Sequence, residues 1–246
     1  MREQVQRLLS WRAALGELAI VVVGVIIALG VGSWWDQKQE RRLEAAHFIE
    51  LRIESARNLE ELRSTLARMD TLKANTLILI EVVEGARPAP PVDSLVELTW
   101  LSFSFATYNP LSTAYDNLLS SGGIQLIRDE GLKRDLALFN AHVEGLQRQD
   151  WVLDQWNRII QPWVISNFQL DWLAPSYREE HGVLDPLVQT DWGAVLQDQE
   201  FKGIVINRLI AITDYMAGLY DLLPAAEAVV DRLEGLAPGP VGVGAS

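Results

Sequence analysis

The feature that most constrains this chain is an uncharged stretch of 18 residues, 18–35. At a helical rise of about 1.5 Å per residue, such a stretch covers about 27 Å, close to the thickness of a bilayer's hydrocarbon core. Backbone in lipid must satisfy its own hydrogen bonds, which favours one helix. Trp11 precedes the stretch, and Trp34 and Trp35 end it. The sequence therefore predicts a transmembrane helix over residues 13–35, with these tryptophans as anchors at the two membrane interfaces.

Two other interpretations of the stretch are weaker. A cleaved signal peptide would have a shorter apolar region followed by a small-residue cleavage site, whereas this stretch ends in two tryptophans. A helix that packs on a soluble core usually shows a polar stripe along its solvent side. The stretch shows none and is rich in valine and isoleucine. We therefore expect an uncleaved, single-pass anchor.

The residues that flank the anchor predict its orientation. The tail, residues 1–12, carries Arg2, Arg7 and Arg12 against one acid, Glu3. The flank after the anchor carries about as many bases, so a count of bases alone does not distinguish the two orientations. A short basic tail is simpler to retain than a long domain, and long domains translocate largely regardless of charge. We expect a bacterial inner-membrane protein with a cytoplasmic N-terminus and a periplasmic main domain.

Composition excludes several classes of function. The formal net charge is −12, and most of the excess acid lies after the anchor. An acidic domain repels phosphate backbones, which argues against nucleic-acid binding. The chain has no cysteine, so it has no disulfide, no thiolate metal site and no cysteine nucleophile.

The chain after the anchor reads as helices. Residues 36–84 contain no proline or glycine, and apolar residues recur there at spacings of three and four. These apolar positions are Ala46, Ile49, Ile53 and Ala56, then Leu59, Leu62, Leu66 and Met69. The sequence predicts one long helix that continues the anchor and ends at Gly85 and the following prolines.

Three further helical regions are predicted. Residues 93–121 form a region broken at Asn109–Pro110, because the residue before proline avoids the α conformation. Asp129 is an expected N-cap for the next helix. That helix has Leu132, Leu136, Phe139, Val143, Leu146, Leu153, Ile160 and Val164 at heptad positions, with Asp150 and Asn157 as polar interruptions. The last helix has Val205, Leu209, Ile212, Met216, Leu219, Leu223, Ala226, Val230 and Leu233, and Pro224 should kink or break it.

The predicted fold is therefore all-α, with the transmembrane helix continuing into a bundle of long helices. We expect a short cytoplasmic tail (1–12), the transmembrane helix (13–35), the extramembrane bundle (36–235) and a glycine- and proline-rich tail (236–246). A longer connection is expected over about residues 173–192.

Two stretches resemble a family of uncharacterised single-span bacterial membrane proteins, a domain of unknown function. The first contains Gly16-Glu17, Gly24, Ile27-Ala28-Leu29 and Trp34 or Trp35; the second contains Asn109-Pro110, Ala114-Tyr115, Leu118, Ser121-Gly122 and Leu126-Ile127. The resemblance covers about half of the chain. It implies a topology and a helical content, and it implies no activity.

The anchor carries a candidate packing face. Gly24, Ala28 and Gly32 recur at a spacing of four, which lets another helix backbone approach closely. The alternative is that glycine is simply frequent in transmembrane helices. Glu17 lies in the first turn of the anchor, where the headgroup region and the helix dipole favour an anion, so we interpret it as an interfacial residue.

No pattern in the sequence predicts catalysis or a cofactor. His47, His142 and His181 do not form a zinc-binding motif, and the anchor has no His, Met or Cys to ligate a haem or chlorophyll metal. There is no nucleophile elbow and no phosphate-binding glycine loop. We expect no enzyme activity, no cofactor and no metal site.

Tryptophan is concentrated in one region. Trp151, Trp156, Trp163, Phe168, Trp172 and Trp192 crowd into about forty residues, and tryptophan is enriched in interfaces. Trp151, Trp163, Trp172 and Trp192 are candidate contacts with a partner. The alternative is that these rings belong to the core, which the heptad spacing of Trp156 and Trp163 favours.

The predicted function is that of a non-catalytic, membrane-anchored accessory or scaffold subunit. It would stabilise a larger membrane protein complex, for which a respiratory or photosynthetic assembly is one setting, and its partners would be the bilayer and other integral membrane subunits. The alternative is a periplasmic helical domain that senses a ligand and acts through a separate transducer. A pocket with converging polar groups would favour that alternative.

Overall fold

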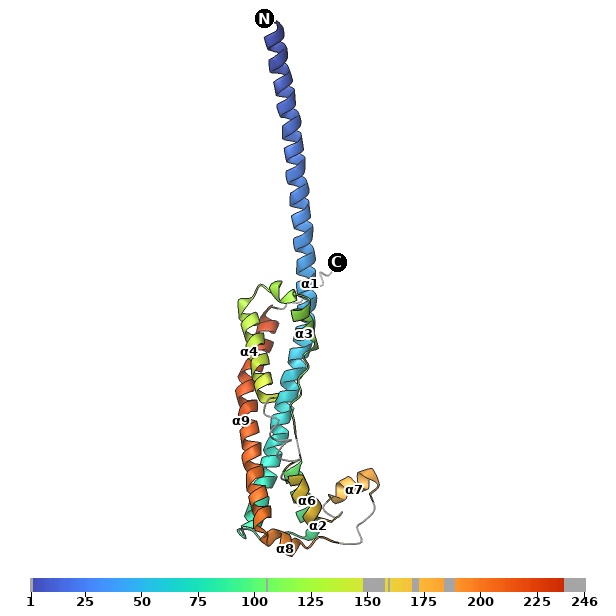
Figure 1. Ribbon diagram of the computed structural model, residues 1–246, viewed down its shortest axis with the longest axis vertical. Coiled ribbons are helices and arrows are strands. Elements are labelled where there is room, and N and C mark those ends of the chain that lie inside the picture. Colours follow the sequence, from blue (N-terminus) through green and yellow to red (C-terminus); the bar gives the residue numbers. More distant parts are fainter. Residues whose placement is uncertain are drawn as a thin grey trace, which may run out of the picture. The chain divides into compact units, whose positions relative to one another are not determined.

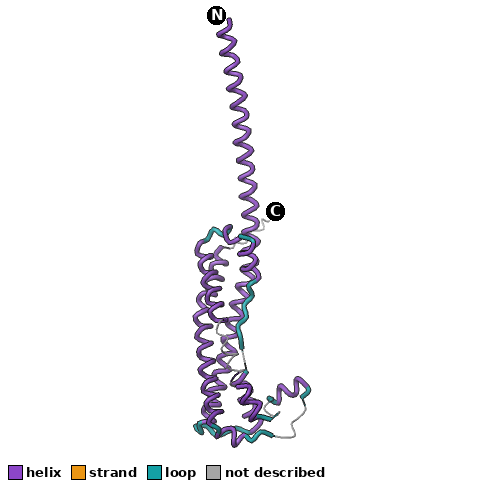
Figure 2. The backbone as a smooth tube through the Cα atoms, in the orientation of Figure 1, coloured by secondary structure: helices purple, strands orange, loops and turns teal. Residues whose placement is uncertain are grey.

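The computed structural model describes the backbone of residues 2–104, 106–147, 158, 160–169, 173–183 and 189–236. It describes the side chains of these residues except 2–30, 33, 36, 37 and 40. Over this part the chain is all-helical, with 82% helix and no strand (Figure 2). The prediction of an all-α fold is therefore confirmed.

The helices follow one another as labelled in Figure 1. They are α1 (Arg2–Val83), α2 (Val92–Phe103), α3 (Thr113–Ser120), the 3-10 helix η1 (Gly123–Gln125), α4 (Glu130–Gln147), α6 (Gln161–Asn167), α7 (Pro175–His181), α8 (Trp192–Gln197) and α9 (Gln199–Leu236).

Helix α1 contains the uncharged stretch and continues past it without a break. It ends at the predicted point, where Gly85 adopts a left-handed conformation with φ of 75° that a side chain would disfavour. Most of the side chains of residues 18–35 lie outside the described part. Where the structure describes the chain, we found no helix with the length and apolar character needed to cross a membrane.

The chain divides into two compact units. Unit 1 comprises residues 1–51 and 114–128, and unit 2 comprises residues 52–113 and 129–246. In unit 1, Leu51 of α1 is buried, as are Ala114 and Leu118 of α3 and Ile127 after η1. The second stretch of the family resemblance therefore supplies much of the apolar interior of this unit.

Unit 2 is built on three long helical segments. α1 contributes Leu59, Leu62, Leu66 and Met69, which are all buried as the spacing predicted. α4 packs along α9 (Figure 1). Each of the five predicted heptad residues of α4 is buried: Leu132, Leu136, Phe139, Val143 and Leu146. The predicted N-cap is confirmed, since the carboxylate of Asp129 accepts a bond of 2.7 Å from the Leu132 amide.

Two details refine the prediction, which allowed either a kink or a break at Pro224. Pro224 does not break the last helix, because α9 continues on both sides of it to Leu236. One missing hydrogen bond is tolerated where Leu219, Leu222 and Ala226 pack into the core. The apolar positions at the start of the predicted long helix are helical but not buried. Ile49 and Ile53 are 54% and 50% exposed.

Candidate functional site

The tryptophans at the end of the uncharged stretch face outward. Trp34 and Trp35 are 58% and 59% exposed, and the ammonium of Lys38 lies 5.0 Å from the ring centroid of Trp34. A ring paired with a cation one turn away suits the boundary between hydrocarbon and headgroups. The side chain of Trp11, the predicted anchor at the other interface, lies outside the described residues.

The candidate packing face is described at one of its three positions. A Cβ atom added at Gly32 would meet no atom within 4 Å. The helix surface is therefore open at Gly32, and another backbone could approach it closely. The side chains at positions 24 and 28 lie outside the described part.

Unit 1 closes around a glycine turn. Gly122 is left-handed, with φ of 72°, and the next residue, Gly123, lies against α1. A Cβ at Gly123 would come within 2.9 Å of His47 Nε2 and 3.1 Å of Leu118 Cδ1. The Arg128 amide donates a bond of 3.3 Å to the Glu44 carboxylate. These contacts explain why two glycines occupy the turn.

A side chain at Gly123 is expected to destabilise unit 1. Gly123→Ala places a methyl group against a histidine and a fully buried leucine, and overpacking typically costs about 1–3 kcal/mol. The control is Gly145→Ala in α4, where nothing lies within 4 Å and alanine should stabilise the helix by about 0.5–1 kcal/mol. Urea unfolding of the full chain in mild detergent measures both. Equal changes in the free energy of unfolding for the two variants would refute the close contact at Gly123.

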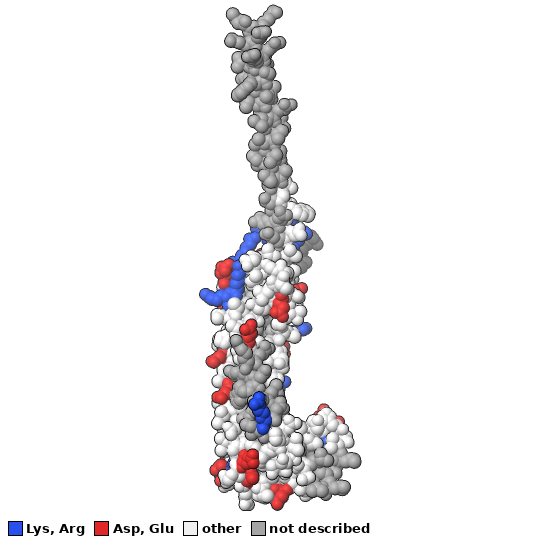
Figure 3. Space-filling model, viewed as in Figure 1, with Lys and Arg blue, Asp and Glu red and all other residues white. Residues whose placement is uncertain are grey.

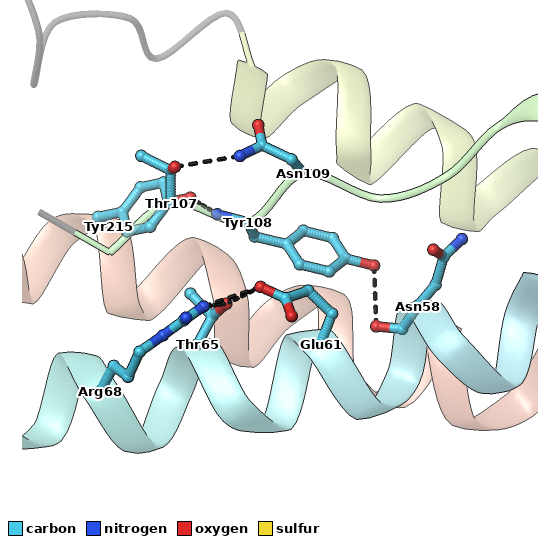
Figure 4. A network of polar contacts seen from close by, with 8 residues as sticks. All are labelled: Asn58, Glu61, Thr65, Arg68, Thr107, Tyr108, Asn109 and Tyr215. Carbon is cyan, nitrogen blue, oxygen red and sulfur yellow. Dashed lines mark hydrogen bonds and ion pairs between the residues drawn. The ribbon is translucent and has the colours of Figure 1, made fainter.

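In unit 2, an extended segment between α2 and α3 is fixed by side chains (Figure 4). The Asn58 amide bonds Leu111 twice, donating to its carbonyl and accepting from its N–H, both at 2.8 Å. The Tyr108 hydroxyl donates to the Asn58 carbonyl at 3.2 Å, and the Tyr108 N–H donates to the Tyr215 hydroxyl at 2.8 Å. We call residues 106–112 the strap. Side chains of α1 and α9 thus satisfy three backbone groups of the strap, the N–H of Tyr108 and the N–H and carbonyl of Leu111, and hold it in the fold.

The strap gives a prediction for alkaline pH. Burial, and then the charge of Glu61, raise the pKa of Tyr108 above 10.0, and burial raises the pKa of Tyr215. A raised folded pKa means that the native state keeps a proton which the unfolded chain loses, so stability present below pH 10 falls as the pH rises. Each tyrosine can contribute a slope of up to about 1.4 kcal/mol per pH unit.

The expected comparison is between the wild type and Tyr108→Phe, with urea unfolding at pH 9, 10 and 11. The variant should lose stability less steeply above pH 10. Burial lowers the pKa of Arg208 to about 10, which gives a slope of opposite sign, but this contribution is common to both proteins. Identical slopes of stability against pH in the two proteins would contradict the conclusion that the buried Tyr108 stays protonated.

Arg208 itself is a buried residue that the sequence did not indicate. It is 2% exposed, and its guanidinium donates to the carbonyls of Ser102, at 3.1 Å, and Ser104. These carbonyls lie at the end of α2, where backbone acceptors lack helical partners. Arg208 therefore joins α9 to the end of α2.

An ion-pair cluster joins α4 and α9. Arg232 Nε lies 2.6 Å from the Asp135 carboxylate and Arg232 Nη1 lies 3.4 Å from Asp129. Bonding to Asp135 raises the pKa of Arg232. Gly131 makes room for the guanidinium, since a Cβ there would collide with it. The two carboxylates are bridged by one arginine, which is an arrangement for holding helices together rather than for proton transfer.

Two of the candidate partner tryptophans lie in the core. Trp163 and Trp192 are each 6% exposed. Trp163 stacks on Phe201 with 5.1 Å between ring centroids and meets Phe168 edge-on at 5.3 Å, while Trp192 lies 5.2 Å from Phe168. The core interpretation therefore applies to these two rings, and we do not assign them a partner. Trp151 and Trp172 lie outside the described residues.

Each of the three histidines has a different environment. His47 packs at Gly123, His142 is exposed on α4, and His181 lies edge-on to Tyr177 at 4.1 Å. Among the side chains that the structure describes, no group of three or more His, Asp or Glu is placed to hold a metal ion.

On the face drawn in Figure 3, acidic side chains lie over the end of unit 2 that carries α8.

Comparison with models of protein families, with curated proteins and with solved structures found no match to this chain.

Proposed function

We propose that this protein is a non-catalytic subunit anchored in a membrane by one helix, and that it stabilises a larger membrane assembly. The observation that carries the proposal is the continuity of α1. One helix contains the uncharged residues 18–35 and continues to Val83, where Leu79, Val82 and Val83 pack into the core of unit 2. A helix with one end in lipid and the other in a packed core holds a domain at the membrane surface.

The proposed topology is a cytoplasmic N-terminus and a periplasmic main domain in a bacterial inner membrane. The basic tail supports this orientation. The exposed Trp34 and Trp35, with Lys38 beside them, support a membrane boundary at this level of α1. The resemblance to the family of uncharacterised single-span proteins belongs to the same proposal.

Other integral membrane subunits are the proposed partners. The Gly24, Ala28 and Gly32 face would receive a neighbouring transmembrane helix, and the open surface at Gly32 supports this. We propose no catalytic role, since the charged clusters of unit 2 join its helices to one another. A respiratory or photosynthetic complex is one setting for such a subunit.

The test is purification from native membranes in mild detergent, with the mass of the assembly measured by native electrophoresis. The chain should migrate with other membrane subunits. Ala28→Leu should weaken or abolish that association, because overpacking costs about 1–3 kcal/mol, comparable with the energies between membrane helices. The control is Ile26→Leu, about 160° from the middle of this face on the helix, which should retain the partners. Migration of the wild-type chain alone would refute the proposed function.

A further inference from the structure

Within unit 1, one side of α1 is apolar, basic and uncovered. Ile49 is 54% exposed, and Ala45 and Ala46 are exposed beside it. Three bases, Lys38, Arg41 and Arg42, are exposed about two to three turns before Ile49. We call these six residues the 38–49 face.

Helical spacing places this face along a single stripe. Positions 38, 42, 45 and 49 follow one another at intervals of four, three and four, so they share one side of the helix. The acids at positions 36, 40 and 44 also follow one another at intervals of four, and this series lies on the other side, while the exposed Glu50 lies between the two sides, one turn after Ala46. Glu44 accepts a bond from the Arg128 amide within unit 1, and His47 packs on Gly123. The side of α1 that contacts residues 114–128 is therefore distinct from the 38–49 face.

An exposed helix side that combines apolar residues with three bases is typical of an interaction surface. Its charge contrasts with the rest of the molecule, because the chain as a whole has a formal net charge of −12. The complementary surface is an apolar seam flanked by carboxylates. A helix presenting Asp and Glu beside small or aliphatic residues fits it, since helices pack by fitting side-chain ridges into grooves.

Two other occupants fit less well. Lipid headgroups extend only a few ångströms beyond the hydrocarbon, so they reach Lys38, three positions after Trp35, but not Ile49, which lies 14 positions after Trp35, about 21 Å further along the helix. A second copy of the chain, held parallel by the same membrane, would place Arg41 and Arg42 opposite the same residues of its partner. Like charges placed opposite one another are destabilising.

Resting on the proposed function, we propose that the 38–49 face binds an acidic amphipathic helix of a membrane protein partner, just outside the bilayer. The carboxylates of that helix would pair with Lys38, Arg41 and Arg42, and its apolar residues would cover Ile49. The partner would thus contact α1 in two places, at the Gly24, Ala28 and Gly32 face within the anchor and at the 38–49 face beyond it.

The experiment uses a photoreactive benzoylphenylalanine at position 49 in the full chain, illuminated in native membranes. The cross-linked peptide is identified by mass spectrometry. We expect a peptide from another membrane protein in which Asp and Glu outnumber Lys and Arg at least twofold. The matched probe is Leu119 in α3, which is 46% exposed and should give at least tenfold less adduct.

Charge reversal provides the second arm. Arg41→Glu combined with Arg42→Glu should lower the yield of the adduct at position 49 at least tenfold. The control is Arg128→Glu, an exposed base of unit 1 outside the stripe, which should keep the yield within twofold. An unchanged yield after reversal at positions 41 and 42 overturns the proposal.

The other possible results of the cross-linking experiment also test the proposal. An adduct with a second copy of the chain, with lipid only, or with a peptide rich in bases overturns the proposal. No adduct from a chain that still migrates with its membrane partners overturns the docking face and leaves the proposed function standing. A chain that is missing from the membrane fraction overturns both.

Discussion

Replacing Trp163 with alanine is expected to lower the free energy of unfolding by about 3–5 kcal/mol, the range for removing a large aromatic side chain from a core. Trp163 is stacked between α6 and α9 on Phe201, which is fully buried, and it also contacts Phe168. Truncation removes these ring contacts and leaves a cavity that neighbouring rings can fill only in part. Urea unfolding of the full chain in mild detergent, followed by circular dichroism, measures the change.

The control is Ile165→Ala, two residues further along α6. Ile165 is 72% exposed, and substitutions at such positions usually change stability by less than about 0.5 kcal/mol. A small effect at Trp163, together with loss of a partner from the membrane assembly, would contradict its place in the core. It would instead restore the interpretation of this ring as a partner contact.

Removing the amide of Asn58 is expected to have the next largest effect. Asn58 is 4% exposed and bonds both the N–H and the carbonyl of Leu111. Asn58→Leu is close in size but leaves these two backbone groups without their partner. Each unsatisfied buried group costs about 1–3 kcal/mol, so we expect the two groups to lower the unfolding free energy by about 2–6 kcal/mol. Hydrogen exchange should speed up at the strap before the long helices.

The matched control is Thr76→Val in the same helix. The Thr76 hydroxyl is fully buried and donates to the Leu72 carbonyl at 2.8 Å. That carbonyl is an acceptor of helix α1 itself, so losing the hydroxyl leaves no buried group stranded, and the cost should stay below about 1 kcal/mol. Equal costs for the two variants would show that the strap is not held by Asn58.

The helices could be predicted because their signals are local. Leu132, Leu136 and Phe139 follow the heptad spacing and are buried, and the end of α1 is marked by Gly85. The break at Asn109–Pro110 was also predictable, since α2 ends at Phe103 and α3 begins at Thr113. The reason is that turns, caps and periodicity depend on a few neighbouring residues.

The rest depends on tertiary contacts that spacing does not reveal. The apolar spacing predicted a buried side chain at Leu209, but its neighbour Arg208 is buried. Arg208 can be buried because carbonyls at the end of α2 accept its hydrogen bonds. Asn58 is a polar residue in an apolar run, and its partner lies 53 residues away. Ile49 has the periodicity of a core residue, yet it is exposed, because periodicity shows that a face is apolar and not what covers it.

The most direct test of the membrane anchor is the accessibility of single cysteines, which this cysteine-free chain allows without background. Ser10→Cys, Val25→Cys and Ser64→Cys are each exposed to a membrane-impermeant maleimide in cells whose outer membrane has been permeabilised. We expect position 64 to be labelled at once, position 10 only after the inner membrane is broken, and position 25 only after denaturation. Labelling of position 25 as fast as position 64, while the inner membrane is intact, would contradict the account.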